Sequence, residues 1–528
     1  MKFFIKNNII SIVFGTFLSK FIGFIRQIFI AAAYGVGITY DAYNYAAIIP
    51  GFLVIIIGGI NGPLHNAIVA VLTPLKTNKA ALILNQVSLK ITSLLIFIGI
   101  IIFFKATFII SKIAPSLDLE TQIIAAKQLQ ILSPCIPLSG FIGLSFGALN
   151  TKNKFLISSL SPSIISIITI IFISIYWINN FQNLEINFFS KTELLAKATL
   201  TGTLIQFLIQ LFEINKIGLL NLNISWLRTS REEKRIFKLI IPASLASGLS
   251  QINVFIDMFF ISSFSGAASG LAYGNLLIQA PLGILSNAII LPLLPKFSKL
   301  IDKNQIKELQ KIFIKGIEYC LLSSVFLGGL FISFNDLIVG LIYQRGAFDF
   351  EAFSTVKKIL IAYAVGIPFY LYKDLLIRFF YSLEKTKLPF QLSLMGIILN
   401  ICFDWILTGG PTTQYGNLFN FNFGVVGVVL SSGLVNLIIC FILSIKLNLN
   451  NYKIPNFVLL KKVIFIIFAC LISSLISRFI INSLYDGNDN NLVKIIILTL
   501  GLFSFSSIYY ILTKILKVNR LNLRSIFK

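Results

Sequence analysis

Two positively charged side chains lie inside a long apolar stretch near the start of the chain. Lys20 and Gln27 are seven residues apart, so a helix places them on one face, and Arg26 lies beside that face. Neither cation has an acidic residue three or four positions away that could neutralise it. A charge at the centre of a membrane-spanning helix costs about 2.5–3.5 kcal/mol. We therefore predict that Lys20 and Arg26 line an aqueous cavity, which suits an anionic or phosphorylated group.

Other polar residues also interrupt apolar stretches, and each has two interpretations. Asp374 and Arg378 are spaced to pair along one helix, and Asn275 and Gln279 are of the type that joins neighbouring helices by hydrogen bonds. The alternative places these side chains around the same cavity. The remaining members are Asp41, Asn44, Gln251, Asn253, Asp257, Lys373 and Asp404. The charges predicted to extend from span ends toward the interface are Lys127, Lys197, Lys315 and Glu318.

The sequence gives no indication of metal chemistry or of an enzymatic site. It has no HExxH or Walker A pattern, its single histidine is His65, and its five cysteines form no CxxC or Cys/His cluster. Asp349 and Glu351 could bind a cation, but a solvated loop is the favoured interpretation. We therefore expect no catalysis and no cofactor, and the identity of any coupling ion stays open.

The composition decides the class of protein. Of 528 residues, 56% are apolar and 12% are charged, and the mean hydropathy is +0.89. Soluble domains carry about 25% charged residues, so these charges are too few to solvate a globular surface of this size. The net charge of +24 comes from basic residues scattered between apolar stretches. That distribution is typical of cytoplasmic loops and argues against nucleic acid as a partner.

The apolar stretches predict an all-α, polytopic membrane protein with about fourteen transmembrane helices, because ~20 apolar residues of helix cross a bilayer core. Gly58, Gly59 and Gly62 predict a bend or break in the second span. The predicted spans are residues 8–34, 39–74, 83–109, 121–150, 155–177, 192–214, 235–264, 268–295, 311–334, 353–382, 388–409, 422–445, 463–482 and 492–513.

The distribution of basic residues predicts the orientation of these spans. With the N-terminus inside, the inner loops and tails hold 28 lysines and arginines, and the outer loops hold seven. This alternation follows the positive-inside rule. Lys20 and Arg26 interrupt the first apolar stretch, so we interpret it as a retained span rather than a signal peptide. Both termini are expected in the cytoplasm of a multi-pass bacterial plasma-membrane protein.

Several segments of the first half of the chain recur in the same order in the second half. This pattern predicts a six-helix lobe over residues 1–230, a second over residues 231–450, and two extra helices with a basic tail over residues 451–528. Both lobes then begin on the inner side, and such parallel repeats bind substrate between the halves. The matching pairs are RQIFIAAAYG (26–35) with DMFFISSFSG (257–266), NAIVAVLTPLK (66–76) with NAIILPLLPK (287–296), and GALNTKNKF (147–155) with YSLEKTKLPF (381–390).

A run of motifs covers most of residues 10–450 in order. The motifs are SKFIGFIRQIFIAAAYGVGITYDAYN (19–44), GALNTKNKF (147–155), LIYQRGAFD (341–349), AYAVGIP (362–368), RFFYSLEKTKLP (378–389) and ILNICFD (398–404). They resemble the MurJ/MviN proteins, the lipid II flippases of the MOP exporter superfamily. GGINGPLHNAIVAVL (58–72) is similar to the form found in cyanobacterial members.

The resemblance implies a two-lobed flippase that carries the undecaprenyl-pyrophosphate-linked peptidoglycan precursor from the inner to the outer leaflet. A cationic central cavity would take the pyrophosphate and sugars, and the last two spans would form a groove for the lipid tail. By motif, Arg26 matches an important first-span arginine, Asp41 matches the acid of the second span, and Lys20 stands where many members have arginine. The expected substrate-binding residues are Lys20, Arg26, Asp41, Asn61, Asn275, Gln279, Lys373 and Arg378.

Two stretches depart from the family pattern. Many members have an Arg-Arg pair and an acid in the second span, where this chain has residues 54–56 (VII) and then Asn61. Leu276 and Gln279 stand where many members have an arginine and an acid. These losses put the identity of the substrate and the ion coupling in question more than the fold.

Other functions stay open beside flipping by alternating access. The alternatives are a cation-coupled exporter of drugs or of another polyprenyl-linked oligosaccharide, a membrane-bound glycosyltransferase, and a non-transporting scaffold in wall synthesis. The expected partners are the lipid-linked precursor and membrane lipids, with cell-wall synthesis or division proteins as candidate protein partners and no nucleic acid.

Overall fold

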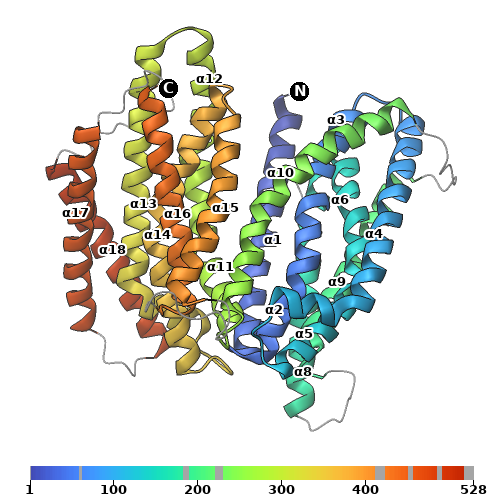
Figure 1. The fold of residues 1–528 in the computed structure, drawn as a ribbon, viewed down its shortest axis with the longest axis horizontal. Helices are drawn as coiled ribbons and strands as arrows, with labels where there is room; N and C mark the ends of the chain where they lie inside the picture. Colours follow the sequence, from blue (N-terminus) through green and yellow to red (C-terminus); the bar gives the residue numbers. More distant parts are fainter. Residues whose placement is uncertain are drawn as a thin grey trace. The chain divides into compact units, whose positions relative to one another are not determined.

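The computed structural model describes residues 2–58, 62–181, 190–220, 230–410, 422–449, 456–484 and 490–516. Within these ranges every regular element is a helix, and no strand occurs (Figure 1). A helix satisfies its own backbone hydrogen bonds, which hydrocarbon cannot do for it. The predicted all-α fold class is confirmed.

Contacts divide the chain into two compact units, an N-terminal unit over Met1–Ser269 and a C-terminal unit over Gly270–Lys528. The repeats in the sequence place the border earlier, between residues 230 and 231. The difference is mainly one helix, α10 (Arg231–Ile261), which packs on α3 (Pro63–Leu72) and α4 (Thr77–Ile113) of the N-terminal unit. The division into two six-helix lobes by sequence repeats stays a prediction.

The N-terminal unit is a bundle of helices drawn from blue to green in Figure 1. Within it α1 packs along α7 and α8, α2 packs on α5, and α6 packs on α3, α4 and α9. Besides α3, α4 and α10, its elements are α1 (Lys2–Tyr34), α2 (Ile38–Leu53), the π-helical turn η1 (Val54–Gly58), α5 (Leu119–Leu132), α6 (Cys135–Thr151), α7 (Phe155–Leu160), α8 (Ser163–Phe181) and α9 (Leu194–Lys216).

The C-terminal unit has α14 as its central helix, packed on α13 and α16. The last two helices, α17 and α18, pack on each other and on α13. The elements that follow α10 are α11 (Ala267–Leu285), the π-helical turn η3 (Ser286–Ile290), α12 (Leu293–Asp302), α13 (Ile306–Tyr343), α14 (Phe350–Ser382), α15 (Lys387–Thr408), α16 (Val425–Leu449), α17 (Asn456–Asn482) and α18 (Asn491–Ile515).

Eleven helices of the described residues are long and apolar enough to cross a membrane, or twelve if α5 and α6, bent by 45°, form one broken span. The two other predicted spans, residues 39–74 and 155–177, correspond to interrupted helices, α2 with η1 and α3, and α7 with α8. The chain is therefore a multi-pass membrane protein. The number fourteen stays a prediction.

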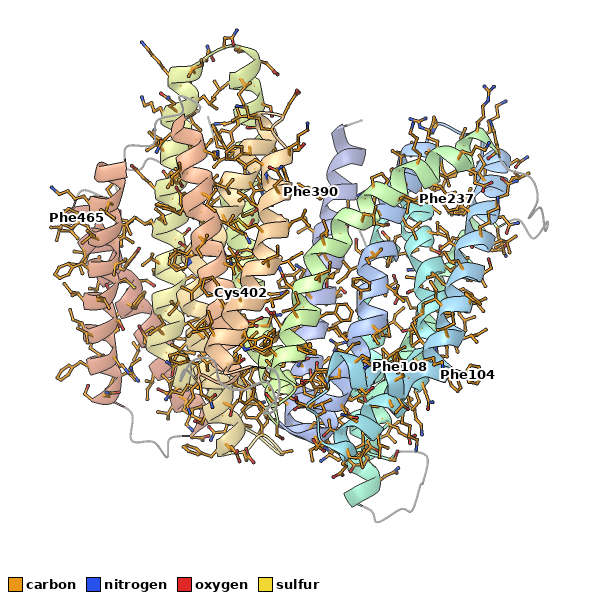
Figure 2. The ribbon with its side chains drawn as sticks, viewed as in Figure 1. Phe104, Phe108, Phe237, Phe390, Cys402 and Phe465 are labelled. Atoms are coloured by element: carbon orange, nitrogen blue, oxygen red, sulfur yellow. The ribbon has the colours of Figure 1, made fainter. Side chains whose placement is uncertain are left out.

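Apolar side chains cover much of the outside of the helices. On α4, Phe104 and Phe108 are 76% and 60% exposed, and Phe390 of α15 is 51% exposed (Figure 2). Leaving apolar surface in water costs about 25 cal/mol per Å². Against lipid tails the same surface costs nothing, so this exterior suits a bilayer.

The second predicted span is interrupted near the glycines that predict a break. The helix α2 contains Pro50 and passes into η1, and α3 begins afresh at Pro63. Gly62, the residue before α3, has an extended backbone with φ −76° and ψ 178°. Proline is favoured at the first position of a helix because its missing N–H would have no partner there. The predicted break is confirmed.

The same local shapes recur 231 positions apart in the chain. Gly35 and Gly266 both have positive φ, at 58° and 76°, and so do Asn153 and Glu384, at 59° and 58°. Positive φ is uncommon for residues other than glycine. Each π-helical turn follows a helix that contains a proline: η1 follows α2, and η3 follows α11. These agreements support the internal repeat inferred from the sequence.

Candidate functional site

The two cations of the first span have no acidic partner in the described residues. Lys20 is exposed on α1, and Arg26 is half-buried six residues further along. The Nε atom of Arg26 is buried and has no hydrogen-bond partner among the described residues. Lys20 and Arg26 form no ion pair there either, whereas eight other pairs do form. A guanidinium with an unused N–H is ready to bind an anion.

A hydrogen bond next to Arg26 fixes α1 against α2. The amide Nε2 of Gln27 donates to the hydroxyl of Tyr40 at 2.5 Å, and both residues are buried. The backbone oxygen of Tyr40 accepts from the Asn44 side chain at 2.8 Å, within α2. Because Gln27 follows Arg26 directly, this bond restricts the rotation of α1 and thereby the direction in which Arg26 points.

Asp41 is placed in a different role from the one that its motif implies. Its carboxylate is 2% exposed and accepts hydrogen bonds from the backbone N–H of Gly266 at 2.6 Å and of Ser269 at 2.7 Å. The hydroxyl of Ser269 donates to it as well, at 2.5 Å. A carboxylate on the free N–H groups of a helix start satisfies them and complements the helix dipole. In this conformation Asp41 thus caps the N-terminus of α11 and is not open to a ligand.

Gly266 is required by this arrangement. Its φ of +76° is a left-handed backbone conformation, and a Cβ atom there would lie 2.5 Å from Cγ1 of Val36. Only glycine adopts such a conformation without strain. The glycine therefore lets the chain turn sharply enough to present its N–H to Asp41.

In the C-terminal unit both predicted cations of α14 have partners. The ammonium of Lys373 donates to the Asn436 side chain at 2.5 Å and lies 5.6 Å from the ring centre of Tyr370. Arg378 pairs with Asp374 through Nε, at 2.9 Å, one turn away on the same helix. The interpretation of a pair along one helix is confirmed for Asp374 and Arg378. Neither pairing excludes a ligand, because Lys373 and Arg378 keep further N–H donors.

The uncharged predicted site residues are placed less clearly. Asn275 is half-buried and Gln279 is exposed on α11, and neither side chain makes a hydrogen bond within the described residues. The alternative interpretation of these two as bonds between helices is therefore not supported. Asn61 lies outside the described residues. Whether Lys20, Arg26, Lys373 and Arg378 line one cavity stays a prediction.

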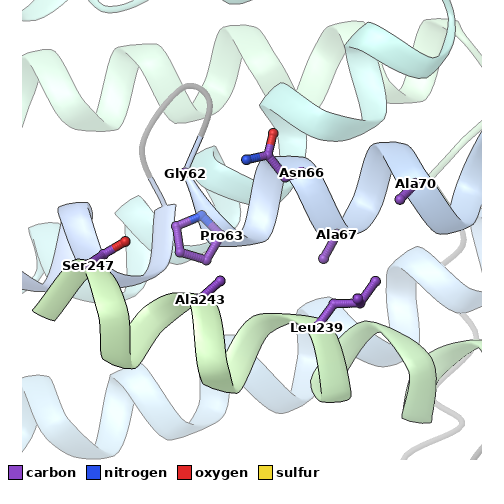
Figure 3. A pocket seen from close by; sticks show the side chains of 8 residues that line it. All are labelled: Gly62, Pro63, Asn66, Ala67, Ala70, Leu239, Ala243 and Ser247. Atoms are coloured by element: carbon purple, nitrogen blue, oxygen red, sulfur yellow. The ribbon is translucent and has the colours of Figure 1, made fainter. Parts of the chain in front are cut away.

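A small cavity lies beside the break in the second span. It measures about 380 Å³ and lies between α3 and the first half of α10 (Figure 3). Small side chains face it from both helices, among them Ala67 and Ala243, and its polar lining comes from Asn66 and Ser247. The cavity has no charged lining residue, so it does not replace the acid that many family members carry in this stretch.

Several charged residues near the span ends form ion pairs. Glu193 lies directly before α9 and accepts hydrogen bonds from Lys127 and, at 2.9 Å, from Lys197. These bonds hold the pKa of Glu193 below its usual range, and the bond from Lys127 has the largest effect. Glu318 pairs likewise with Lys462. Each of Lys127, Lys197 and Glu318 thus has an ion-pair partner, either distant in sequence or one turn away. That these side chains extend toward the interface stays a prediction.

Asp404 on α15 is a buried acid that does not belong to the expected substrate-binding residues. Asp404 is fully buried and accepts hydrogen bonds from the side chains of Asn400, at 2.9 Å, and of Ser431 on α16. The spacing of Asn400 and Asp404, four residues apart in an apolar stretch, is the signal in the sequence. Within the described residues, no group of three or more His, Cys, Asp or Glu side chains could hold a metal ion.

Comparison with known families decides the identity of the fold. The family model described as "Lipid II flippase MurJ" matches residues 30–517. The chain belongs to the MurJ family. A MurJ relative from Synechocystis, named "Probable lipid II flippase MurJ", is 38% identical over 81% of this chain and 79% of its own length. A MurJ relative of the same name from Buchnera aphidicola subsp. Acyrthosiphon pisum is 28% identical over 97% of this chain and 98% of its own. The resemblance drawn from the motifs is confirmed.

Solved structures agree with the MurJ fold. A structure titled "Lipid II flippase MurJ, inward closed conformation" matches with a TM-score of 0.73 and 24% identity, over 96% of this chain and 99% of that one. An inward-facing multidrug resistance MATE transporter of the MOP superfamily matches with a TM-score of 0.58 and 13% identity, over 80% and 92%. At these identities the matches establish a shared fold.

Proposed function

We propose that this MurJ-family protein flips undecaprenyl-pyrophosphate-linked peptidoglycan precursor, lipid II, from the inner to the outer leaflet of the bacterial plasma membrane. The relatives named as lipid II flippases support the substrate. The observation that carries the proposal for this chain is the unpaired state of Arg26, whose Nε has no hydrogen-bond partner among the described residues. A buried N–H of a cation costs free energy when it has no hydrogen-bond partner, and a bound anion would supply one.

In the proposed mechanism Arg26 and Lys20 hold the pyrophosphate. Arg26 presents a planar fork that matches phosphate oxygens, and Lys20 adds a point charge from the same helix. Lys373 and Arg378 contribute from α14, with Asn275, Gln279 and Asn61 as polar contacts to the sugars. Opening alternates between the cytoplasmic and the outer side, and both termini lie in the cytoplasm. The ion that couples the cycle stays open.

Asp41 acts in this proposal on the conformation rather than on the substrate. Its three hydrogen bonds join α2 to the start of α11, and the orientation inferred from loop charges puts this junction at the outer end of the span. A junction held by a buried carboxylate has two discrete states, bonded and broken. We infer that it is bonded when the outer side is closed and breaks when that side opens.

Complementation tests the assignment. A cell depleted of its own flippase should not grow when it carries the Arg26→Ala variant, although the variant inserts into the membrane. Arg235→Ala is the matched control, because Arg235 is an exposed arginine at the start of α10 with no ion pair among the described residues. Normal growth of the Arg26→Ala strain would exclude the role of this cation. Lys20→Arg should keep function, since the charge is retained.

Two further measurements separate the alternatives. Vesicles containing the purified protein and labelled lipid II should expose the label on the opposite leaflet, and a drug exporter or an exporter of another oligosaccharide would not move it. A cysteine at position 20 should react with a water-soluble thiol reagent if Lys20 lines an aqueous cavity. A lack of reaction, together with a lack of lipid II movement, would favour the non-transporting scaffold.

A further inference from the structure

An apolar cavity lies inside the N-terminal unit, and neither Lys20 nor Arg26 lines it. It measures about 440 Å³ and is surrounded by α2, the end of α5, α6, α8 and α9. The residues that line it are mostly buried. Cys135 of α6 is 6% exposed and Gln206 of α9 is 3% exposed. The space therefore lies in the interior of the bundle rather than on its surface.

Small side chains leave this space unfilled. On α2 the lining includes Gly51, where an added Cβ would meet no atom within 4 Å. On α6 it includes Cys135 and Ser139, and on α9 it includes Thr203. Protein interiors are packed as densely as organic crystals, and voids larger than a water molecule are few. A gap of this size between packed helices therefore calls for an occupant.

The chemistry of the lining restricts what the occupant can be. No charged residue lines the cavity, so it offers nothing to an anionic head group. Its hydroxyl donors are engaged within the protein, because Ser139 donates to the backbone oxygen of Ile136 and Thr203 to that of Thr199, both at 2.7 Å. The amide of Gln206 donates to the hydroxyl of Ser161 at 3.3 Å. Apolar cavities of this kind do not hold water.

We propose that this cavity binds the hydrocarbon chain of a membrane lipid. The lining is mostly apolar and its hydroxyl groups are bonded within the protein, as in ligand pockets for apolar molecules, and the volume falls within the roughly 300–1,000 Å³ of small-molecule sites. The surrounding helix α9 and the bent pair α5–α6 are membrane-spanning by length and composition, so lipid chains are the apolar molecules at hand. This inference does not depend on lipid II flipping.

Occupancy has a structural consequence for α2. Pro50, Gly51 and Val54 line the cavity, and Val54 is the first residue of η1. A bound chain therefore packs directly on the point where α2 changes into a π-helical turn. Such turns are frequent at functional sites. The bound lipid chain supports this irregular segment, which has no dense protein packing on that side.

Photolabelling tests the proposal on the purified full-length protein. The probe is hexadecanol carrying a diazirine at its methyl end, activated by light and mapped by peptide mass spectrometry. We expect adducts on the lining residues of α2, α6 and α9, and a loss of at least about fivefold in these adducts for Gly51→Phe, which fills the cavity. Phe104, on the exposed outside of α4, is the internal reference and should be labelled equally in all variants.

Gly283→Phe is the matched control. Gly283 also has no atom within 4 Å of an added Cβ, but it lies on α11 in the C-terminal unit and does not line the cavity. The proposal is overturned if adducts appear only at outside positions such as Phe104. It is equally overturned if the probe labels the cavity residues to the same extent in Gly51→Phe and in Gly283→Phe. Gel filtration and circular dichroism must show that both variants are folded.

A second measurement needs no substitution. The thiol of Cys135 lines the cavity, whereas Cys320 is a buried thiol in the C-terminal unit. The uncharged reagent N-phenylmaleimide should modify Cys135, and added hexadecanol should slow this reaction at least about threefold without changing that of Cys320. No reaction at Cys135, or no protection by hexadecanol, contradicts the proposal. Protection by benzene but not by hexadecanol would identify a site for compact apolar molecules and overturn the assignment to a lipid chain.

Discussion

The carboxylate of Asp41 accepts two hydrogen bonds from Ser269, one from its backbone N–H at 2.7 Å and one from its hydroxyl at 2.5 Å. Together with the N–H of Gly266 this makes Asp41 the cap of α11, although α11 begins more than 220 residues later in the chain. Each buried donor that loses its partner costs about 1–3 kcal/mol. Asp41→Ala should therefore lower the unfolding temperature in detergent by several degrees.

Asp118→Ala is the control for this prediction. Asp118 caps α5 through the Thr121 N–H at 2.9 Å but is exposed, so water replaces the lost bond and the decrease should be small. Equal decreases for the two variants would show that the burial of the Asp41 cap contributes nothing.

The ion cluster before α9 predicts a pH dependence of stability. Because bonds from Lys127 and Lys197 lower the pKa of Glu193 in the folded protein, this carboxylate stabilises the fold above its unfolded pKa of about 4.5. The contribution is lost as the pH falls through the lower, folded pKa. Thermal unfolding should thus separate wild type from Glu193→Gln at pH 7, and the separation should shrink as the pH falls below 4.5.

The control for the pH prediction is Glu120→Gln. Glu120 is an exposed acid in the first turn of α5 with no ion pair among the described residues. Its substitution should change the unfolding temperature little at either pH. If the difference in unfolding temperature between wild type and Glu193→Gln is as large at low pH as at pH 7, the role of the cluster is contradicted.

The sequence predicted most of the fold because apolar length and loop charge are local signals. The break before Pro63 followed from neighbouring glycines, and the pairing of Asp374 with Arg378 followed from helical spacing. The partner of Asp41 could not be found in this way, because nothing near Asp41 in the sequence identifies Ser269. The same holds for the bond of Glu193 to Lys127. An ion pair between helices depends on how the helices pack, and the spacing of residues along one helix does not show this.

The buried acid of α15 predicts a strong effect of substitution. Asp404→Ala removes an acceptor that Asn400 and Ser431 share. The buried amide of Asn400 loses this bond where no water can replace it, whereas the Ser431 hydroxyl keeps the backbone oxygen of Val428 as an acceptor. The loss should be about 2–4 kcal/mol, near the cost of breaking a buried polar network. Asp349→Ala, which removes an exposed cap from α14, should cost less than half as much when unfolding is followed by circular dichroism. Comparable losses would mean that the Asp404 network is not formed.

The contact of α13 with the last two helices depends on the absence of a side chain at Gly329. A Cβ atom there would lie 2.1 Å from Sγ of Cys470 on α17 and 3.2 Å from the ring of Phe505 on α18, so the Cys470 side chain or one of the helices would have to shift. Overpacking of this kind typically costs 1–3 kcal/mol. Gly329→Ala should therefore lower the unfolding temperature, while Gly283→Ala, with no neighbour within 4 Å, should not. Adding Cys470→Gly to Gly329→Ala removes the clashing sulfur and should restore part of the loss. A double variant that unfolds as early as Gly329→Ala alone, or earlier, would mean that the contact with Cys470 is not what limits the packing of α13 on α17.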